Sequence, residues 1–144
     1  MTTLIAKFVL PVLVVAMLYL LISGNFFSPS PFVIAAQLFA IGLSVWARRT
    51  FQPGQFNIAA EPKPGARLST GPYQLIRHPM YAAALILIWA AVLGHLSLST
   101  AIVGLLVTGG IAIRTVVEEQ LLRAHYADYA AYAHRTKRII PFVL

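Results

Sequence analysis

Long stretches without charge constrain the fold of this chain more than any other feature. Four of them cover about residues 4–22, 32–47, 80–93 and 96–113, and Lys7 is the one charged residue inside them. At about 1.5 Å of rise per residue, the longer stretches match a hydrocarbon core of about 30 Å when they are α-helical. The sequence therefore predicts an all-α integral membrane protein with four transmembrane helices, in one domain of residues 1–144.

The basic residues show on which side of the membrane the connections lie. The formal net charge of +7 by itself suggests a nucleic-acid partner, but ten of the eleven Lys and Arg residues fall within the two ranges 48–77 and 114–138. This arrangement follows the positive-inside rule. It places a loop of residues 48–79, a C-terminal arm of residues 114–144 and both termini in the cytoplasm, on an inner or plasma-type membrane. The first apolar stretch has no Ala-x-Ala cleavage site, so we expect a retained anchor.

A polar segment leads into the third apolar stretch. Residues 71–81 read Gly-Pro-Tyr-Gln-Leu-Ile-Arg-His-Pro-Met-Tyr. Pro79 suits the first turn of a helix and biases His78 away from helical backbone angles. In one interpretation Arg77 binds lipid phosphate and Tyr81 joins the interfacial aromatic belt. In the other, the backbone groups before the helix and the His78 and Tyr81 side chains face a ligand.

Two of the four acidic residues stand side by side just beyond the last apolar stretch. Glu118 follows Arg114 by four residues, and Glu119 precedes Arg123 by four. Such pairs contribute only about 0.3–0.5 kcal/mol each when exposed. Adjacent residues lie about 100° apart on a helix, so we expect one pair in water and the other facing inward. Arg114 and Glu118 lie nearer the membrane and are favoured as the inward pair.

Two further patterns concern the C-terminal arm and the histidines. Apolar residues between 116 and 132 recur at helical spacing, which predicts an amphipathic helix continuing to about Ala133. The histidines do not form a metal site, because His78 and His95 are separated by a helix of roughly 25 Å. His125 and His134 would lie on opposite faces of a helical arm. No metal ion is expected, and the chain has no cysteine to bind one.

Several short motifs follow one another in order over about residues 65–144. They are Gly71-Pro72-Tyr73, Arg77-His78-Pro79-Met80-Tyr81, Glu118-Glu119 with Leu121-Leu122, Tyr129-x-x-Tyr132 and Ile139-Ile140-Pro141. This set resembles the isoprenylcysteine carboxyl methyltransferase family, which belongs to a wider group with phospholipid N-methyltransferases. The resemblance implies a helical membrane enzyme that uses S-adenosylmethionine without a Rossmann domain. Its acceptor would be lipophilic, an isoprenylcysteine-like carboxylate or a lipid amine, and would enter from the bilayer.

The resemblance also implies roles for individual residues. Cofactor contacts are expected at Leu68, Tyr73, His78, Pro79, Met80, Tyr81 and Glu118. Arg114 would face the substrate, and Arg114 and Glu119 are the expected catalytic residues. His78 or Glu119 would accept a proton from an amine or thiol acceptor. The chain departs from the family pattern at Ala83, where Gly is frequent, and at Tyr126-Ala127, where Phe-Gly is common.

Two other functions stay open on the sequence alone. A membrane sterol-type reductase using NADPH has similar C-terminal motifs but a longer chain. A non-catalytic small membrane subunit would use the same residues as anchors, with Arg114 and Glu118 facing water or lipid head groups. The expected partners are membrane lipid and a lipophilic or lipidated substrate, without nucleic acid. The oligomeric state is left open.

Overall fold

The computed structural model describes residues 2–51 and 70–139, and in this part of the chain it is all-helical. The helices are α1 (Thr2–Ile22), α2 (Pro31–Arg49), α3 (Pro79–Gly94), α4 (Leu98–His125) and α5 (Tyr129–Arg135), with a short 3-10 helix η1 (Gly71–Gln74) before α3. The all-α fold class and the positions of the four long apolar helices are confirmed.

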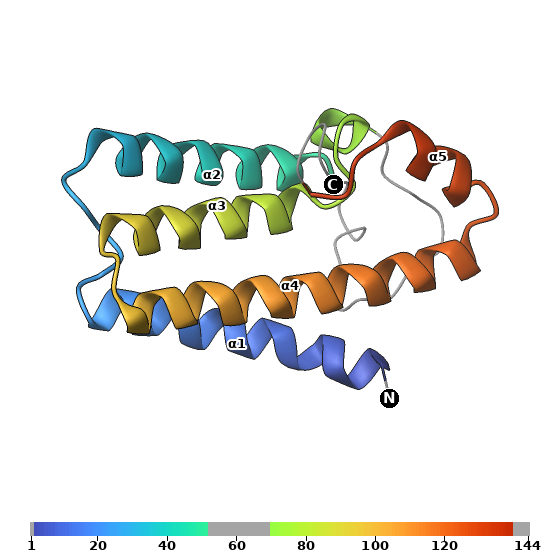
Figure 1. The fold of residues 1–144 in the computed structure, drawn as a ribbon. Helices are drawn as coiled ribbons and strands as arrows, with labels where there is room; N and C mark the ends of the chain where they lie inside the picture. The colour runs from blue at the N-terminus through green and yellow to red at the C-terminus, as the bar shows by residue number, and fades with distance from the viewer. Residues whose placement is uncertain (1, 52–69, 140–144) are drawn as a thin grey trace.

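The four long helices form an antiparallel bundle (Figure 1). α2 packs along α3, α1 packs along α4, and α3 also contacts α4. The core lies between α1, α3 and α4 and includes Leu20, Ile88 and Ile111. α1 begins and α4 ends at the end of the bundle that carries η1 and α5 (Figure 1).

Large apolar side chains cover the outside of this bundle. Phe32 is 85% exposed, and Leu38 and Leu105 are also exposed. A helix of a soluble bundle places polar residues on its outer face, so an apolar outer face favours contact with lipid. By length and composition α2 and α4 are able to cross a membrane, whereas the described apolar parts of α1 and α3 are shorter.

α4 is longer than the charge-free stretch that it contains. Its 28 residues extend about 42 Å, compared with a core of about 30 Å. The charge-free part of α4 ends at Ile113. The turns from Arg114 to His125 therefore project beyond the apolar layer.

The start of α3 agrees with the role predicted for Pro79. This proline is the first helical residue, and His78 before it has non-helical backbone angles (φ −124°, ψ 59°). The His78 carbonyl accepts hydrogen bonds from the N–H groups of Tyr81 and Ala82 at 3.1 and 3.0 Å. The proline and its effect on the preceding residue thus fix where the helix begins.

The C-terminal arm is not the single helix that was predicted. α4 ends at His125, Tyr126 is extended (φ −112°, ψ 116°), and α5 begins at Tyr129. Because of this break, α5 folds back toward η1 (Figure 1), and Tyr129 and Tyr132 are buried. A continuous helix would place these two side chains away from the bundle. The free energy gained by burying them outweighs the helical preference of the segment.

The chain after α5 pairs with the segment before α3. Ile76 and Lys137 form an isolated parallel β-bridge. The N–H groups of Arg77 and His78 donate to the carbonyls of Lys137 and Arg138 at 2.7 and 2.9 Å. The expectation that these backbone groups face a ligand is therefore wrong for the two amides, because the C-terminal segment uses them.

Gly71 provides a test of the turn that enters η1. Its φ is +57°, and a Cβ atom there would lie 2.7 Å from Thr50 Oγ1. Left-handed backbone costs an L-residue about 1–2 kcal/mol, so Gly71→Ala should lower the free energy of unfolding by about 2 kcal/mol. Chemical or thermal unfolding in detergent measures this loss. Gly42→Ala is the control, because its added methyl meets no atom within 4 Å and should cause no loss.

Candidate active site

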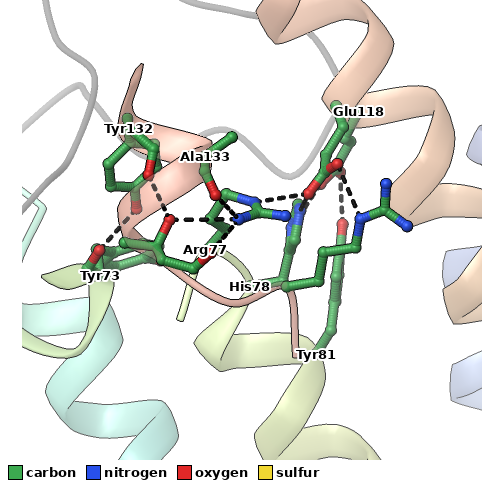
Figure 2. Close-up of polar contacts among 10 residues, drawn as sticks. Tyr73, Arg77, His78, Tyr81, Glu118, Tyr132 and Ala133 are labelled. Atoms are coloured by element: carbon green, nitrogen blue, oxygen red, sulfur yellow. Dashed lines mark hydrogen bonds and ion pairs between the residues drawn. The ribbon is translucent and has the colours of Figure 1, made fainter. Parts of the chain in front are cut away.

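Three segments meet at one end of the bundle and form a cluster of polar side chains (Figure 2). They are the end of the 71–81 segment with the first turn of α3, the outer turns of α4, and the chain after α5. We define the charged cluster as Arg77, His78, Tyr81, Arg114, Glu118, Glu119 and Arg138. The cluster lies beside the apolar part of the bundle, where ionisable groups are costly to bury and commonly functional.

Glu119 is the more deeply buried of the two carboxylates. Arg77 Nε donates to its Oε1 at 2.8 Å, and Arg138 Nε donates to its Oε2 at 3.0 Å. Its side chain is only 4% exposed. The predicted surface pair with Arg123 is wrong: within the described residues no ion pair joins the two, and the Arg123 guanidinium lies over the Tyr129 ring at 5.7 Å. The C-terminal segment covers Glu119, which the helix phase of α4 alone did not reveal.

Arg77 connects all three segments. Besides Glu119, its guanidinium donates through Nη1 to the carbonyls of Ala133, at 2.9 Å, and Thr136. The side chain is 8% exposed. The interpretation of Arg77 as an anchor to lipid phosphate is therefore wrong, because the side chain is buried and its Nε and Nη1 donate inside the protein.

Glu118 forms the second half of the cluster. Arg114 Nε donates to Glu118 Oε1 at 3.1 Å and to the Tyr81 hydroxyl oxygen at 2.6 Å. The Tyr81 hydroxyl in turn donates to Glu118 Oε1. The prediction that Arg114 and Glu118 form an inward pair is confirmed. Glu118 keeps 17% of its side chain exposed, so its carboxylate still has accessible surface.

His78 lies between the two carboxylates. Its Nδ1 is 3.6 Å from Glu118 Oε2, and its Nε2 is 3.5 Å from Glu119 Oε1. The ring stacks on Tyr81 with centroids 5.5 Å apart and planes at 10°. Among the described residues, the Thr115 and Tyr129 hydroxyls and His78 Nε2 are buried without a hydrogen bond, and His78 Nε2 has only the longer contact with Glu119. Buried polar atoms of this kind normally bind water or a ligand.

The other predicted site residues lie at different distances from this cluster. Tyr73 is on the far side of Arg77 from Glu118 (Figure 2), and its carbonyl accepts from the Tyr132 hydroxyl at 2.7 Å. Pro79 is fully buried, and Met80 is partly exposed on the first turn of α3. Leu68 lies outside the described residues. The structure thus brings together His78, Tyr81, Arg114, Glu118 and Glu119.

Two members of the cluster were not predicted from the sequence. Arg77 was not expected to bind inside the protein, and Arg138 was not expected at the site. The available signal was the concentration of basic residues on the side that carries the Glu pair. That signal indicates a shared side of the membrane but no pairing, because the return of the chain after α5 is a tertiary feature.

Residues 30–129 match the model of the phospholipid methyltransferase family. The chain belongs to this family. The match runs from just before α2 to the first residue of α5, so it includes the 71–81 segment and both glutamates. None of the curated proteins and none of the solved structures matches the chain.

Membership in the phospholipid methyltransferase family indicates a membrane methyltransferase and bears out the resemblance at the level of the wider group. A non-catalytic subunit would expose Arg114 and Glu118 to water or head groups. Arg114 is instead buried, and both side chains are bonded to Tyr81. The geometry disagrees with the anchoring interpretation of these residues.

The charge of Glu119 in this family member makes stability depend on pH. Burial alone would raise the pKa of its carboxyl, but the polar contacts and charges of His78 and Arg77 outweigh burial and lower the pKa from 4.5 to about 2. A carboxyl with a depressed pKa in the folded state adds stability above its unfolded value and loses it as the pH falls. The window of loss is therefore pH 4.5 down to about 2.

We expect Glu119→Gln to flatten the fall in melting temperature across this window. Thermal unfolding in detergent, measured at pH steps between 4.5 and 2, checks the slope against that of the unaltered protein. Asp128→Asn removes an acidic group outside the cluster and should leave most of the slope in place. An equally steep fall in Glu119→Gln would show that other groups cause it.

Proposed function

We propose that this chain transfers a methyl group from S-adenosylmethionine to a lipophilic acceptor at the cytoplasmic face of the membrane. One observation carries the proposal: a chain of a methyltransferase family holds a buried carboxylate–arginine–histidine–tyrosine cluster just beyond an apolar helix. The proposal includes four membrane spans with both termini in the cytoplasm. The concentration of cations at the end of the bundle that carries the cluster supports this orientation.

The residues present suit this cofactor. S-adenosylmethionine has a sulfonium, an ammonium group and ribose hydroxyls, all of which carboxylates and aromatic faces bind well. Glu118 has accessible carboxylate surface, and the stacked His78 and Tyr81 rings lie beside it. When bound there, the cofactor would supply a methyl group already activated by positively charged sulfur.

The chain's own residues would bind and orient the cofactor and exclude water from it. Glu118 would hold hydroxyl or amino groups of the cofactor, with His78 and Tyr81 as walls. Pro79 and Met80 lie directly between those two in the chain, and Tyr73 and Leu68 are proposed as further contacts. Positioning and water exclusion are the main demands of methyl transfer from an activated donor.

Arg114 is proposed to face the acceptor. Its Nε is bonded to Tyr81 and Glu118, which fixes the plane of the guanidinium. A fixed guanidinium suits a phosphate or carboxylate through two parallel hydrogen bonds. The family description favours a phospholipid, and hence a lipid amine, over an isoprenylcysteine carboxylate.

An amine acceptor has to lose a proton. Both oxygens of Glu119 accept hydrogen bonds from arginines, which makes this carboxylate a weak base. His78, whose Nδ1 lies 3.6 Å from the partly exposed Glu118 carboxylate, is the better candidate to accept the proton. We therefore assign Glu119 a positioning role, holding Arg77, Arg138 and the imidazole in place.

Ligand binding distinguishes this function from the alternatives. Calorimetry on the detergent-purified protein should detect S-adenosylmethionine but not NADPH, and Glu118→Ala should weaken binding about 10- to 100-fold, as for loss of a charged hydrogen bond. Asp128→Ala is the matched control and should bind normally. Binding of NADPH alone would favour a reductase, and binding of neither ligand would favour a non-catalytic subunit.

A further inference from the structure

An apolar cavity of about 570 Å³ lies beside the charged cluster, between α2, α3 and α4. Its volume is within the range of roughly 300–1,000 Å³ typical of ligand sites. Apart from its tryptophans, Thr108 contributes the one polar side chain among the lining residues. That hydroxyl is already used: it donates to the Gly104 carbonyl at 2.7 Å and accepts from Trp89 Nε1 at 3.0 Å. The cavity therefore suits a hydrocarbon group.

The residues that line the cavity and those of the charged cluster are neighbours in the chain. Each of three lining residues directly adjoins a cluster residue: Ile76 precedes Arg77, Ala82 follows Tyr81, and Ile139 follows Arg138. A molecule with an apolar tail in the cavity would thus have its head group at the cluster. Phe39 and Trp46 of α2 also line the cavity and are exposed on the outer face of the bundle, where lipid would lie.

Trp89 is the lining residue of α3 farthest from the cluster. It lies ten residues beyond Pro79, or about 15 Å along the helix axis. Its indole is fixed by the bond to Thr108, and a Cβ atom at Gly104 would lie only 3.2 Å from its ring. Gly104 and Thr108 are four residues apart on α4, so the ring is held against one face of that helix at the far end of the cavity.

We propose that this cavity binds one apolar chain of the methyl acceptor and that Trp89 limits the length of chain that fits. The inference rests on the proposed function, which places the acceptor head group at Arg114. The volume of about 570 Å³ and the apolar lining suit one hydrocarbon chain. The second chain of a phospholipid stays in the bilayer beyond Phe39 and Trp46.

The test uses binding alone, so it does not depend on methyl transfer. Trp46 and Trp89 are the only tryptophans of the chain, and both line the cavity. In Trp46→Phe, the fluorescence therefore reports on Trp89. A lysophospholipid brominated at the chain terminus should quench it saturably at one equivalent, and unbrominated lysophospholipid should reverse the quenching. Quenching that only follows the mole fraction of brominated lipid in the micelle would overturn the proposal.

Competition by lysophospholipids of increasing chain length tests the role of Trp89. Affinity should rise about fourfold for each buried methylene until the chain reaches Trp89, and then level off. In Trp89→Ala, read out through Trp46, the plateau should move to longer chains. Trp89→Phe keeps most of the packing and should move it less, which covers the case that the alanine variant does not fold. An unchanged plateau in a folded variant would contradict the role of Trp89.

These binding experiments and an assay of methyl transfer can fail independently of each other. Suppose the protein binds lysophospholipid saturably and with a length limit but transfers no methyl group. That result would support binding of an apolar chain in the cavity and would contradict the proposed methyl transfer. Methyl transfer without saturable quenching of Trp89 would support the proposed reaction and overturn the proposal that the cavity binds an apolar chain.

Discussion

Replacing Arg77 by methionine should lower the free energy of unfolding by about 3–5 kcal/mol, the usual cost of removing one partner from a buried ion pair. The Arg77 guanidinium joins Glu119 to the carbonyls of Ala133 and Thr136, so its loss leaves Glu119 Oε1 and two carbonyls without this donor, while the half-exposed Arg138 still pairs with the buried carboxylate. It also removes one of the two arginines that join Glu119 of α4 to the C-terminal part of the chain, and Arg138 is the one that remains. Thermal and chemical unfolding in detergent measure the loss.

A double substitution shows whether the buried charge causes this effect. Arg77→Met combined with Glu119→Leu removes both charges and should recover much of the stability, because paired removal leaves no uncompensated ion. Arg138, the other partner of Glu119, is half-exposed and reaches water without it. Arg135→Met changes an exposed arginine of α5 and should have little effect. A double variant as unstable as Arg77→Met would contradict this account.

Substituting lysine for Arg114 should lower kcat/KM for the acceptor about 10- to 100-fold, the loss expected for a charged hydrogen bond. Lysine keeps the positive charge but lacks the planar fork that pairs with phosphate or carboxylate. It also cannot reproduce the single Nε–H that bonds both Tyr81 and Glu118. Initial rates with varied acceptor at saturating S-adenosylmethionine measure the effect.

Binding of the cofactor provides the comparison for Arg114→Lys. The affinity for S-adenosylmethionine should change less than kcat/KM for the acceptor, because the proposed cofactor contacts belong to other residues. Arg123→Lys lies on the same helix outside the cluster and should retain activity. Equal losses in cofactor affinity and in kcat/KM would mean that Arg114 acts through Glu118 rather than on the acceptor.

The helices and one side of the site follow from local patterns in the sequence. The charge-free stretches gave the positions of α1 to α4, because an apolar helix in lipid satisfies its backbone internally. Pro79 defined the start of α3, and helix phase brought Arg114 to Glu118. The ordered motifs pointed to the wider methyltransferase group, which the family match supports.

The other side of the site depends on tertiary structure. Glu119 is buried because the chain breaks after His125, turns back at α5 and pairs residue 137 with residue 76. Neither the break nor the pairing leaves a periodic signal, since only the three residues 126–128 change the direction of the arm. Arg77 and Arg138 therefore read as surface cations in the sequence, although the fold directs both onto one carboxylate.

Transfer of a labelled methyl group tests the central claim most directly. The purified protein is incubated with S-adenosylmethionine labelled at the methyl group and with membrane phospholipid, and the lipid is then extracted and counted. The account predicts label in the lipid fraction with the unaltered protein and with Asp128→Asn, and loss of that label with Glu118→Gln. Lipid that stays unlabelled although the protein binds the cofactor, or labelling that Glu118→Gln leaves unchanged, would contradict it.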